Sequence, residues 1–566
     1  MENTPIITEA AVNNKKERLK KWLKDPYNLV FIAIIVFSII LRLYYFSLTK
    51  DQPLWWDEAD YMAYAKNLAG FSTNWVVTSL HNSIIPYIAA LLFKIGLNEV
   101  IQKFLLEFIP SIFIIFLTYS IASIMYKDKR IALIAAFSIS TLWELLFDNM
   151  RFHLETPALL SGLLAIYVFF KGYEKKEKIF GKIDCKWAIP LTVFFVVLTY
   201  SIRRGYFLFG LFFLFYLLFT SDFKTLLKNK YNWIALAVFV VLFFIVENSI
   251  FISPIGEVSG AYYNKQLPIN LVPLQIFNTY FSNPYAQAYS ILFYLFWIGF
   301  ILVCFNLLMS WGHFKDIKNK ESRSDLFVFV MLLVTLGFFI IMRIRDANTN
   351  SIGDPRWYFP LILASFICIA KSTLIIADYG KKYHKYIAVV VIVVLIGYGG
   401  YYELKQADVL IKSKINTYTG VKKASLFIKS VSQPGDAVYG KSGPQVSFYS
   451  ERNFAEPDKL LNPDSNKILL EDFLAMLRTE KGANIKYIII TISEPGYSPW
   501  MKTVSYAQDP QTGQTYLSKL EIPFMNTTID FSIGKQDIKQ SVKYGDIEFR
   551  LLTIIDDAFV YRIVKQ

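Results

Sequence analysis

The sequence contains few cysteines and few charged residues for its length. Its three cysteines, Cys185, Cys304 and Cys368, lie in or beside apolar segments, without paired spacing and without histidine neighbours. Neither a disulfide framework nor a zinc site is therefore indicated. Charged residues make up 18% of the 566 positions and hydrophobic residues 54%, whereas about a quarter of the residues in soluble domains are charged. This composition argues against a water-soluble enzyme.

Other signatures are missing as well. No short repeat occurs, and the 26 glycines and 21 prolines are an ordinary number for this length, so collagen-like, coiled-coil and low-complexity classes are excluded. No phosphate-binding loop, dinucleotide fingerprint or serine nucleophile elbow stands in a suitable context. A nucleotide-driven pump therefore has no support in the sequence.

The positive charge of the chain is unevenly distributed. Of the net charge of +14, +12 lies before Glu403, in the apolar part of the chain. An excess placed there suits the control of membrane topology better than the binding of DNA or RNA. No nucleic-acid partner is expected.

Long apolar runs fill the first 400 positions. They have roughly the length that crosses a bilayer, and they predict a multi-pass α-helical membrane protein with about eleven transmembrane helices. The predicted spans are 28–48, 104–125, 131–147, 154–170, 187–201, 205–220, 233–252, 287–309, 326–342, 358–377 and 386–402.

The distribution of basic residues predicts the orientation of these spans. The basic segment 1–27 precedes the first span without a small-residue cleavage site, so we expect it to stay attached and to lie in the cytoplasm. With eleven crossings, the loops on that side carry 25 basic residues, as the positive-inside rule requires. The apolar segment 83–97 is then placed outside, in the plane of the interface, and the C-terminal end also lies outside.

Three domains are expected. The first is the cytoplasmic N-terminus 1–27, and the second is a transmembrane domain over 28–402 with long outward loops at 49–103 and 253–286. The third, 403–566, is predicted to be an extracytoplasmic soluble α/β domain. In it, polar turns separate the β-prone runs 486–492 and 547–555 from an amphipathic helix near 468–478.

The first outward loop carries two adjacent acids, Asp57 and Glu58, directly after two tryptophans. Helical spacing would place Tyr61 and Tyr64 on the same face as Asp57, so that a carboxylate lies beside an aromatic wall at the membrane surface. A hydroxyl acceptor and a lipid-linked donor would meet at such a place. The alternative is that Asp57 only caps an interfacial helix beginning at Glu58.

A second acid, Glu155, opens the fourth predicted span just inside the outer interface. Carboxylates at this depth are costly and are usually either paired or functional. The alternative to a functional role is an internal salt bridge to Arg151, one helical turn away.

Arginine and lysine are sorted between the two sides. Only three of the 25 basic residues on the inside are arginine, whereas the outward loops hold Arg151, Arg203, Arg204, Arg343, Arg345 and Arg356. Topology does not distinguish lysine from arginine, but phosphate recognition does, because a guanidinium presents a planar fork that stays charged. An anionic, phosphate-bearing ligand at the outer face is predicted, with Arg356 as the first contact and Arg203 and Arg204 next. Ordinary interfacial snorkelling is the alternative.

A metal site receives only weak support. His81 and His153 could join Glu58 or Glu155 around a divalent cation, but two histidines without fixed helical spacing are a poor signal. No metal ligand is assigned, and a divalent cofactor is left open.

The order of these short motifs resembles a known family. The chain resembles the GT-C membrane glycosyltransferases of the protein O-mannosyltransferase and aminoarabinose transferase type. The resemblance rests on Trp56-Asp57-Glu58-Ala59 with Tyr61, on a later acid at Glu155, and on Arg356-Trp357-Tyr358-Phe359-Pro360 at the start of a late span. Relatives often carry His-Pro-Pro after the first acids, where this chain has His81-Asn82-Ser83, and an arginine before the second span, where Lys103 stands nearest. The WWDYG motif of oligosaccharyltransferases is absent, which disfavours transfer of a whole oligosaccharide to asparagine.

The resemblance implies a reaction. A sugar on a polyprenyl phosphate would pass, with inversion, to a hydroxyl of a protein, lipid or glycan, with Asp57 as base, Glu58 completing the pair and Glu155 as second acid. The residues that would contact the substrates are Arg151, Arg203, Arg204, Arg356, Lys103, His81, Tyr61, Tyr64 and Tyr358. Membrane lipids would surround the isoprenoid tail. We expect a prokaryotic plasma membrane with the active site outside. A transporter or flippase of an anionic lipid is the alternative, although inverted repeats and broken helices are not evident in the sequence, and a non-catalytic scaffold is a third.

Overall fold

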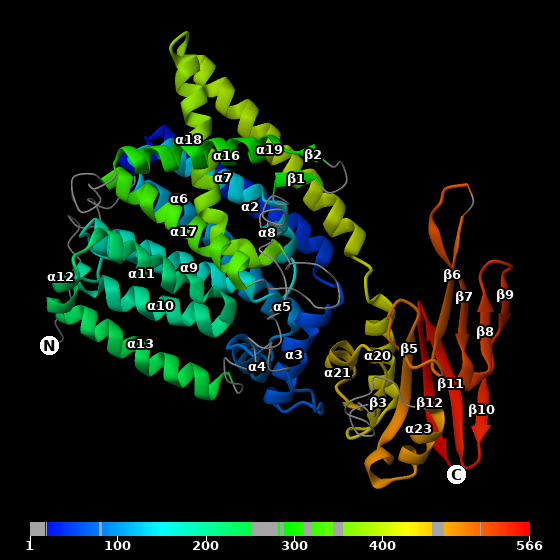
Figure 1. Ribbon diagram of the computed structural model, residues 1–566. Coiled ribbons are helices and arrows are strands. Elements are labelled where there is room, and N and C mark those ends of the chain that lie inside the picture. Colours follow the sequence, from blue (N-terminus) through cyan, green and yellow to red (C-terminus); the bar gives the residue numbers. More distant parts are fainter. Residues whose placement is uncertain are drawn as a thin grey trace, which may run out of the picture. The chain divides into compact units, whose positions relative to one another are not determined.

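The computed structural model describes residues 17, 20–77, 82–251, 281–283, 288–310, 320–342, 355–455, 469–509 and 511–566 (Figure 1). The chain divides into two compact units. Met1–Lys50 and Glu99–Ile415 form the first, here named the transmembrane unit. Asp51–Asn98 and Asn416–Gln566 form the second, here named the C-terminal unit.

Nine helical segments among the described residues are long and apolar enough to cross a bilayer. This confirms the prediction of a multi-pass membrane protein. Their main helices are α2 (Pro26–Thr49), α6 (Ile109–Met125), α9 (Glu155–Val168), α10 (Ala188–Ile202), α13 (Lys230–Ser249), α16 (Ile291–Met309), α17 (Lys320–Met342), α18 (Ile362–Lys381) and α19 (Lys385–Lys414).

The two other predicted spans, 131–147 and 205–220, are also helical but shorter. The first is split at Leu142 into α7 (Lys129–Thr141) and α8 (Trp143–Asp148), because Leu142 leaves the helical conformation with ψ at 118°. The second consists of the 3₁₀ turn η5 (Arg204–Phe207) and α11 (Leu208–Thr220). Helices of 13 residues, as α7 and α11 are, extend about 20 Å, less than the roughly 30 Å of a hydrocarbon core.

The centre of the transmembrane unit is α18, whose side chains are mostly buried and which packs against α7, α16 and α19. It supplies Lys371, whose Nζ lies 2.7 and 2.6 Å from the two carboxylate oxygens of the fully buried Asp325 in α17. Asp325 also accepts hydrogen bonds from Tyr126 (2.6 Å) and from Asn306 of α16 (2.5 Å). One buried carboxylate therefore joins three helices and the end of α6.

The C-terminal unit is built on two sheets. The larger sheet has the order β10-β11-β12-β5-β3-β4, in which β3, β4 and β5 run parallel and the other pairs are antiparallel. The smaller sheet, β6-β7-β8-β9, is antiparallel. The strands are β3 (Ala437–Tyr439), β4 (Asn453–Ala455), β5 (Ile485–Thr491), β6 (Thr503–Gln508), β7 (Thr515–Ile522), β8 (Thr527–Asp530), β9 (Lys535–Asp537), β10 (Ser541–Tyr544), β11 (Ile547–Ile555) and β12 (Ala558–Lys565).

Both faces of the larger sheet are covered, as the alternation along β5 shows. Tyr487 and Ile489 belong to a core shared with α20 (Thr419–Val431) and α21 (Gly443–Ser450). Ile488 and Ile490 point into a second core, which is shared with α23 (Leu470–Leu477) and the smaller sheet. The apolar run at 486–492 therefore forms a central strand that is buried on both sides. The predicted strands at 486–492 and 547–555 and the helix near 468–478 are confirmed as β5, β11 and α23.

Two helices of the C-terminal unit come from the first loop. They are α3 (Trp56–Ala69) and α4 (Ile85–Lys94), and α3 packs against α4 and α21. The segment 51–98 thus packs with the C-terminal residues, although the predicted transmembrane domain, 28–402, included it. The predicted boundary at 403 falls inside α19, which continues without a break to Lys414.

Candidate active site

The first-loop acids lie in the first turn of α3. The helix begins at Trp56, and its N-cap residue is Trp55, so the alternative considered above, in which Asp57 caps a helix starting at Glu58, does not hold. Two carboxylates in the first turn are favoured by the unpaired backbone N–H groups and the positive end of the helix dipole. The helix ends at Gly70, whose φ of +92° closes it in the left-handed conformation.

Tyr61 and Tyr64 follow Asp57 along α3 by one and two turns, and both are buried. The ring of Tyr64 meets that of Tyr87 edge-on, with 6.1 Å between the centroids. Burial, together with a hydrogen bond to Tyr87, raises the pKa of Tyr64 to about 12. Tyr64, like tyrosine in general, is a neutral phenol at physiological pH and can act as a hydrogen-bond donor.

The second acid, Glu155, is held between two arginines of the transmembrane unit. Its Oε1 lies 3.1 Å from a terminal nitrogen of Arg203, and 3.8 Å from Nε of Arg356. Arg203 directly follows α10, and Arg356 lies in the 3₁₀ helix η7 (Pro355–Leu361). Since α9 begins at Glu155, Arg151 precedes the helix and the one-turn spacing to Glu155 does not apply. The guanidinium of Arg151 lies over the ring of Phe147, 5.0 Å from its centroid.

His153 extends this cluster. Its Nε2 lies 3.2 Å from a terminal nitrogen of Arg356, and its Nδ1 is hydrogen-bonded to Asp148. Because a guanidinium only donates hydrogen bonds, Nε2 is the acceptor and Nδ1–H donates to Asp148. Asp148 also accepts a hydrogen bond from Thr156 at 3.3 Å. No local pattern pointed to Asp148 as a site residue; its position at the end of an apolar run, shortly before His153 and Glu155, is the signal that could have identified it.

Asp148, His153 and Glu155 are also a set of cation ligands. One donor atom from each lies within 4.8 Å of the others, and all three residues are buried. The ligand types and the spacing fit a divalent cation. However, both ring nitrogens of His153 are already engaged, so a cation could bind His153 only in place of Arg356, and it would share Glu155 with both arginines. Of the alternative metal ligands named above, His81 lies outside the described residues.

The adjacent arginines 203 and 204 point to different helices. Arg204 pairs with Glu247 of α13 at 3.5 Å, and its guanidinium lies 3.9 Å from the centroid of the Phe251 ring. Tyr200 donates a hydrogen bond to the same carboxylate of Glu247 at 2.5 Å. This arrangement is typical of a residue that anchors the end of α10 to α13.

The remaining predicted residues are placed as follows. Tyr358 is buried in η7, with its ring 4.5 Å from that of Phe339, and its hydroxyl has no hydrogen-bond partner among the described residues. Lys103 is buried at the end of α5 (Glu99–Lys103), directly before the π-helical turn η2 (Phe104–Phe108). Arg343 and Arg345 lie outside the described residues.

The predicted site is thus divided between the two units. Asp57, Glu58, Tyr61 and Tyr64 belong to the C-terminal unit, whereas Glu155, the described arginines and Tyr358 belong to the transmembrane unit. Within the transmembrane unit, the structure brings Glu155, Arg203 and Arg356 together with His153. The convergence of both groups in one cavity stays a prediction.

Several solved membrane enzymes have a similar fold. An oligosaccharyltransferase of Archaeoglobus fulgidus tethered to an acceptor peptide matches with a TM-score of 0.54 and 12% identity over 88% of this chain and 74% of its own. The same organism's AglB, in complex with an inhibitory peptide and a dolichol-phosphate, matches with 0.52 and 12% over 88% and 74%. ArnT of Cupriavidus metallidurans bound to undecaprenyl phosphate matches with 0.53 and 13% over 82% and 93%.

Sequence comparison adds no relative: no protein-family model and no curated protein matches the chain. The structural similarity extends over most of the chain and of its structural neighbours. It confirms, at the level of fold, the resemblance that the short motifs indicate. The chain therefore shares the fold of these oligosaccharyltransferases and of ArnT.

Proposed function

We propose that the protein is a membrane glycosyltransferase that moves a sugar from a polyprenyl phosphate to a hydroxyl group of a protein, lipid or glycan. The fold supports this proposal, because AglB and ArnT were each solved with a polyprenyl phosphate. The observation that carries it is the position of Glu155 within 4 Å of both Arg203 and Arg356.

The two guanidinium groups supply what a departing phosphate needs. A phosphate monoester offers more oxygens and more negative charge than a carboxylate, and arginine binds such oxygens in pairs. The polyprenyl phosphate that leaves the sugar is such a monoester, and at Arg203 and Arg356 it competes with Glu155 for the same donors. As the bond between the anomeric carbon and the phosphate oxygen breaks, these groups stabilise the charge that develops on the phosphate. No general acid is required, because the phosphate leaves as an anion.

The acceptor hydroxyl needs a base, and Asp57 is proposed for this role. Asp57 takes the hydroxyl proton while the acceptor oxygen forms its bond to the anomeric carbon. Attack from the side opposite the phosphate inverts the configuration of the sugar. Glu58 completes the acid pair, and Tyr61 and Tyr64 form the aromatic wall beside it. The reaction takes place at the outer face of a prokaryotic plasma membrane, with the C-terminal unit outside.

A divalent cation is compatible with this scheme. Asp148, His153 and Glu155 would hold it, and it would add positive charge close to the departing phosphate. The chain's own contribution is then to orient Glu155 through the two arginines and His153 through Asp148.

The decisive experiment measures donor binding in the purified protein. Undecaprenyl phosphate serves as the probe, because it needs no knowledge of the sugar. Arg356→Lys keeps the charge but removes the fork, and we expect it to weaken binding about tenfold, the loss of one paired contact. Arg130→Lys is the matched control, since Arg130 pairs with Asp128 and Asp378 at another place in the transmembrane unit. Equal binding by Arg356→Lys and the control would contradict the proposal.

Two further measurements separate the proposal from transport. Mass spectrometry of surface glycans, with and without the gene, should show the loss of one sugar. A flippase would instead move a fluorescent polyprenyl phosphate across sealed vesicles, without any transfer of sugar.

A further inference from the structure

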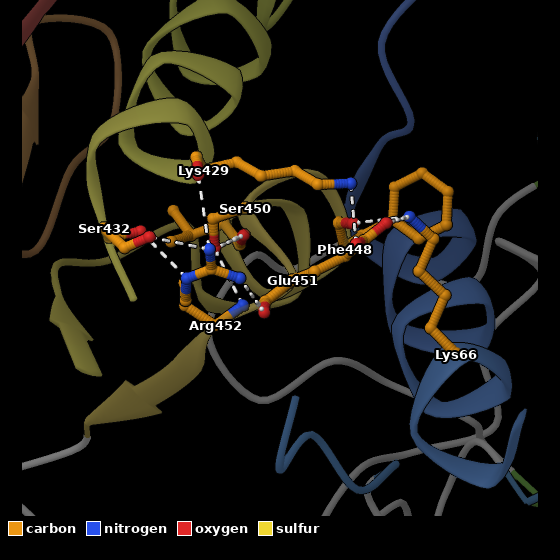
Figure 2. Close-up of polar contacts among 8 residues, drawn as sticks. Lys66, Lys429, Ser432, Phe448, Ser450, Glu451 and Arg452 are labelled. Atoms are coloured by element: carbon orange, nitrogen blue, oxygen red, sulfur yellow. Dashed lines mark hydrogen bonds and ion pairs between the residues drawn. The ribbon is translucent and has the colours of Figure 1, made fainter. Parts of the chain in front are cut away.

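One buried ion pair joins the first-loop helix α3 to the C-terminal part of the same unit, Asn416–Gln566, here named the C-terminal segment. Lys66 Nζ lies 2.7 Å from Oε1 of Glu451, and the two side chains are only 10% and 15% exposed (Figure 2). Lys66 also donates a hydrogen bond to the carbonyl of Phe448 at 2.9 Å. Its ammonium group lies 4.1, 5.4 and 5.9 Å from the ring centroids of Phe448, Phe71 and Phe93. The carboxylate, the carbonyl and the three rings form a cage around the ammonium group. Because a buried charge is costly unless it is paired, this cage holds Lys66 in one position.

The partner, Glu451, adopts an unusual backbone conformation. It ends α21 with φ at +52°, in the left-handed region where glycine is the usual residue. Its carboxylate bonds Lys66 with one oxygen and Lys429 with the other, at 2.6 Å (Figure 2). Burial alone would raise the pKa of Glu451, but the hydrogen bonds from Lys429 and Lys66 hold the pKa below its ordinary value. A side chain is thus kept at a glycine-like position, where it makes two ion pairs.

The backbone around Glu451 is itself held in place. Arg452 donates hydrogen bonds to the carbonyls of Glu451 (2.9 Å), Lys429 (3.2 Å) and Ser432 (3.0 Å), and to the hydroxyl of Ser432 (2.8 Å) (Figure 2). These bonds tie the end of α21 to the end of α20. Lys66 therefore binds a rigid part of the C-terminal segment.

Other contacts dock the first loop onto the same segment. The backbone N–H of Leu54 donates to the hydroxyl of Tyr449 at 2.8 Å. The side-chain amide of Asn74 bonds both backbone groups of Phe454 in the edge strand β4, at 2.9 and 3.4 Å. Trp75 meets the Phe454 ring edge-on at 5.9 Å. The loop is thus bonded to the C-terminal segment before α3, at the end of α3 and after it.

We infer that Lys66 and Glu451 are positioning residues for the acid pair Asp57 and Glu58. In this inference, the C-terminal segment fixes the orientation of α3. This inference rests on the proposed function of Asp57. Nine residues separate Asp57 from Lys66, about 14 Å along a helix. A tilt of α3 by about 5° about the contact at Lys66 therefore moves the carboxylate of Asp57 by about 1 Å. Such a displacement can lower a reaction rate on the order of 100-fold.

The test uses three variants of the full-length protein. Lys66→Met removes the charge and keeps an unbranched apolar side chain in the cage. Glu451→Gly removes the carboxylate and accommodates the positive φ. Lys429→Met is the matched control. It removes the other ion pair of the Glu451 carboxylate, but that pair lies within the C-terminal segment and does not involve α3.

We expect Lys66→Met and Glu451→Gly to lower the kcat of sugar transfer about 10- to 100-fold. Binding of undecaprenyl phosphate should stay within about twofold, because the arginine cluster lies in the other unit. Lys429→Met should transfer sugar at close to the wild-type rate. The double variant Lys66→Met/Glu451→Gly should be no slower than the worse single variant, because both changes remove the same contact.

Each outcome has a distinct meaning. Wild-type kcat in Lys66→Met and Glu451→Gly, with Asp57→Asn inactive, overturns the positioning role and leaves the proposed function intact. An equal loss of kcat and of donor binding also overturns it, since that result indicates general misfolding. Full activity of Asp57→Asn refutes the proposed function of Asp57 itself.

Discussion

Arg203 lies 3.1 Å from Glu155, whereas the next residue in the chain, Arg204, pairs with Glu247 of α13. The 3₁₀ turn that starts at Arg204 separates the directions of the two side chains. Neighbouring arginines that look equivalent in the sequence thus serve different places in the transmembrane unit.

This divergence predicts unequal effects of the same substitution. Arg203→Lys should weaken the binding of undecaprenyl phosphate about tenfold, because a lysine cannot offer the paired donors of a guanidinium. Arg204→Lys should leave binding within about twofold and lower the melting temperature instead, since it loses the stacking on Phe251. Binding titrations and thermal unfolding of both variants check this pair. The reverse ranking in binding would contradict it.

Asp57→Asn should abolish most of the transfer activity. A general base typically contributes about 100- to 10,000-fold to a rate, and asparagine cannot accept the proton. Binding of undecaprenyl phosphate should not change, because Asp57 is not a donor contact in this scheme. The measurement is single-turnover sugar transfer in membranes, and Asp51→Asn, which removes an exposed carboxylate shortly before α3, is the control for charge loss in the same loop.

The buried pair of Lys371 and Asp325 should be important for stability. Lys371→Met leaves Asp325 buried without its cation, so we expect the free energy of unfolding to fall by about 3–5 kcal/mol. Lys412→Met removes the half-exposed pair with Asp408 and should cost less than about 1 kcal/mol. Unfolding by SDS in detergent micelles compares the two. The double variant Asp325→Asn/Lys371→Met should be more stable than Lys371→Met alone.

Lys502 predicts a pH dependence of the C-terminal unit. Its ammonium is buried and bonds the carbonyls of Thr491 (2.7 Å), Ile492 (2.9 Å) and Glu494. Burial lowers the pKa of Lys502 to about 8, whereas unfolded lysine titrates near 10.4. Between these values the unfolded state binds the extra proton, so the contribution of Lys502 to stability rises from about pH 8 to about pH 10.4.

The measurement compares the melting temperatures of the wild type and Lys502→Met across this range. We expect the difference between them to shift in favour of the wild type as the pH increases. A difference that does not change with pH would show that the pKa of Lys502 is not lowered.

Local patterns in the sequence predicted the apolar helices and, in the C-terminal unit, the strands β5 and β11 and the helix α23, but not the other strands of the two sheets. The described residues of the eleven predicted spans are mainly helical, because a chain in hydrocarbon must satisfy its backbone hydrogen bonds within each segment; the strand β2 (Ala288–Tyr289) at the start of the span 287–309 is an exception. The strand β5 could be recognised because a short apolar run between polar turns suits a strand that is buried on both faces. The break at Leu142 could not, since no proline or glycine marks it.

Some residues of the candidate site could likewise be predicted from the sequence, and others could not. Arg203, Arg356 and Glu155 could be named from the sorting of arginine and from the depth of the acid, because residue type alone carries that chemistry. Asp148 escaped notice, since its role depends on His153 five residues later and on a turn whose shape local patterns do not specify.

The sequence by itself determined that this is a multi-pass membrane protein with a C-terminal α/β domain and a set of arginines suited to phosphate. These properties follow from composition, periodicity and side-chain chemistry, which act locally. Only the tertiary structure decided that the acid-bearing loop at 51–98 is built into the C-terminal unit. The contact between Lys66 and Glu451 spans 385 positions, and such a pairing depends on shape and charge complementarity between distant segments, which no local pattern records.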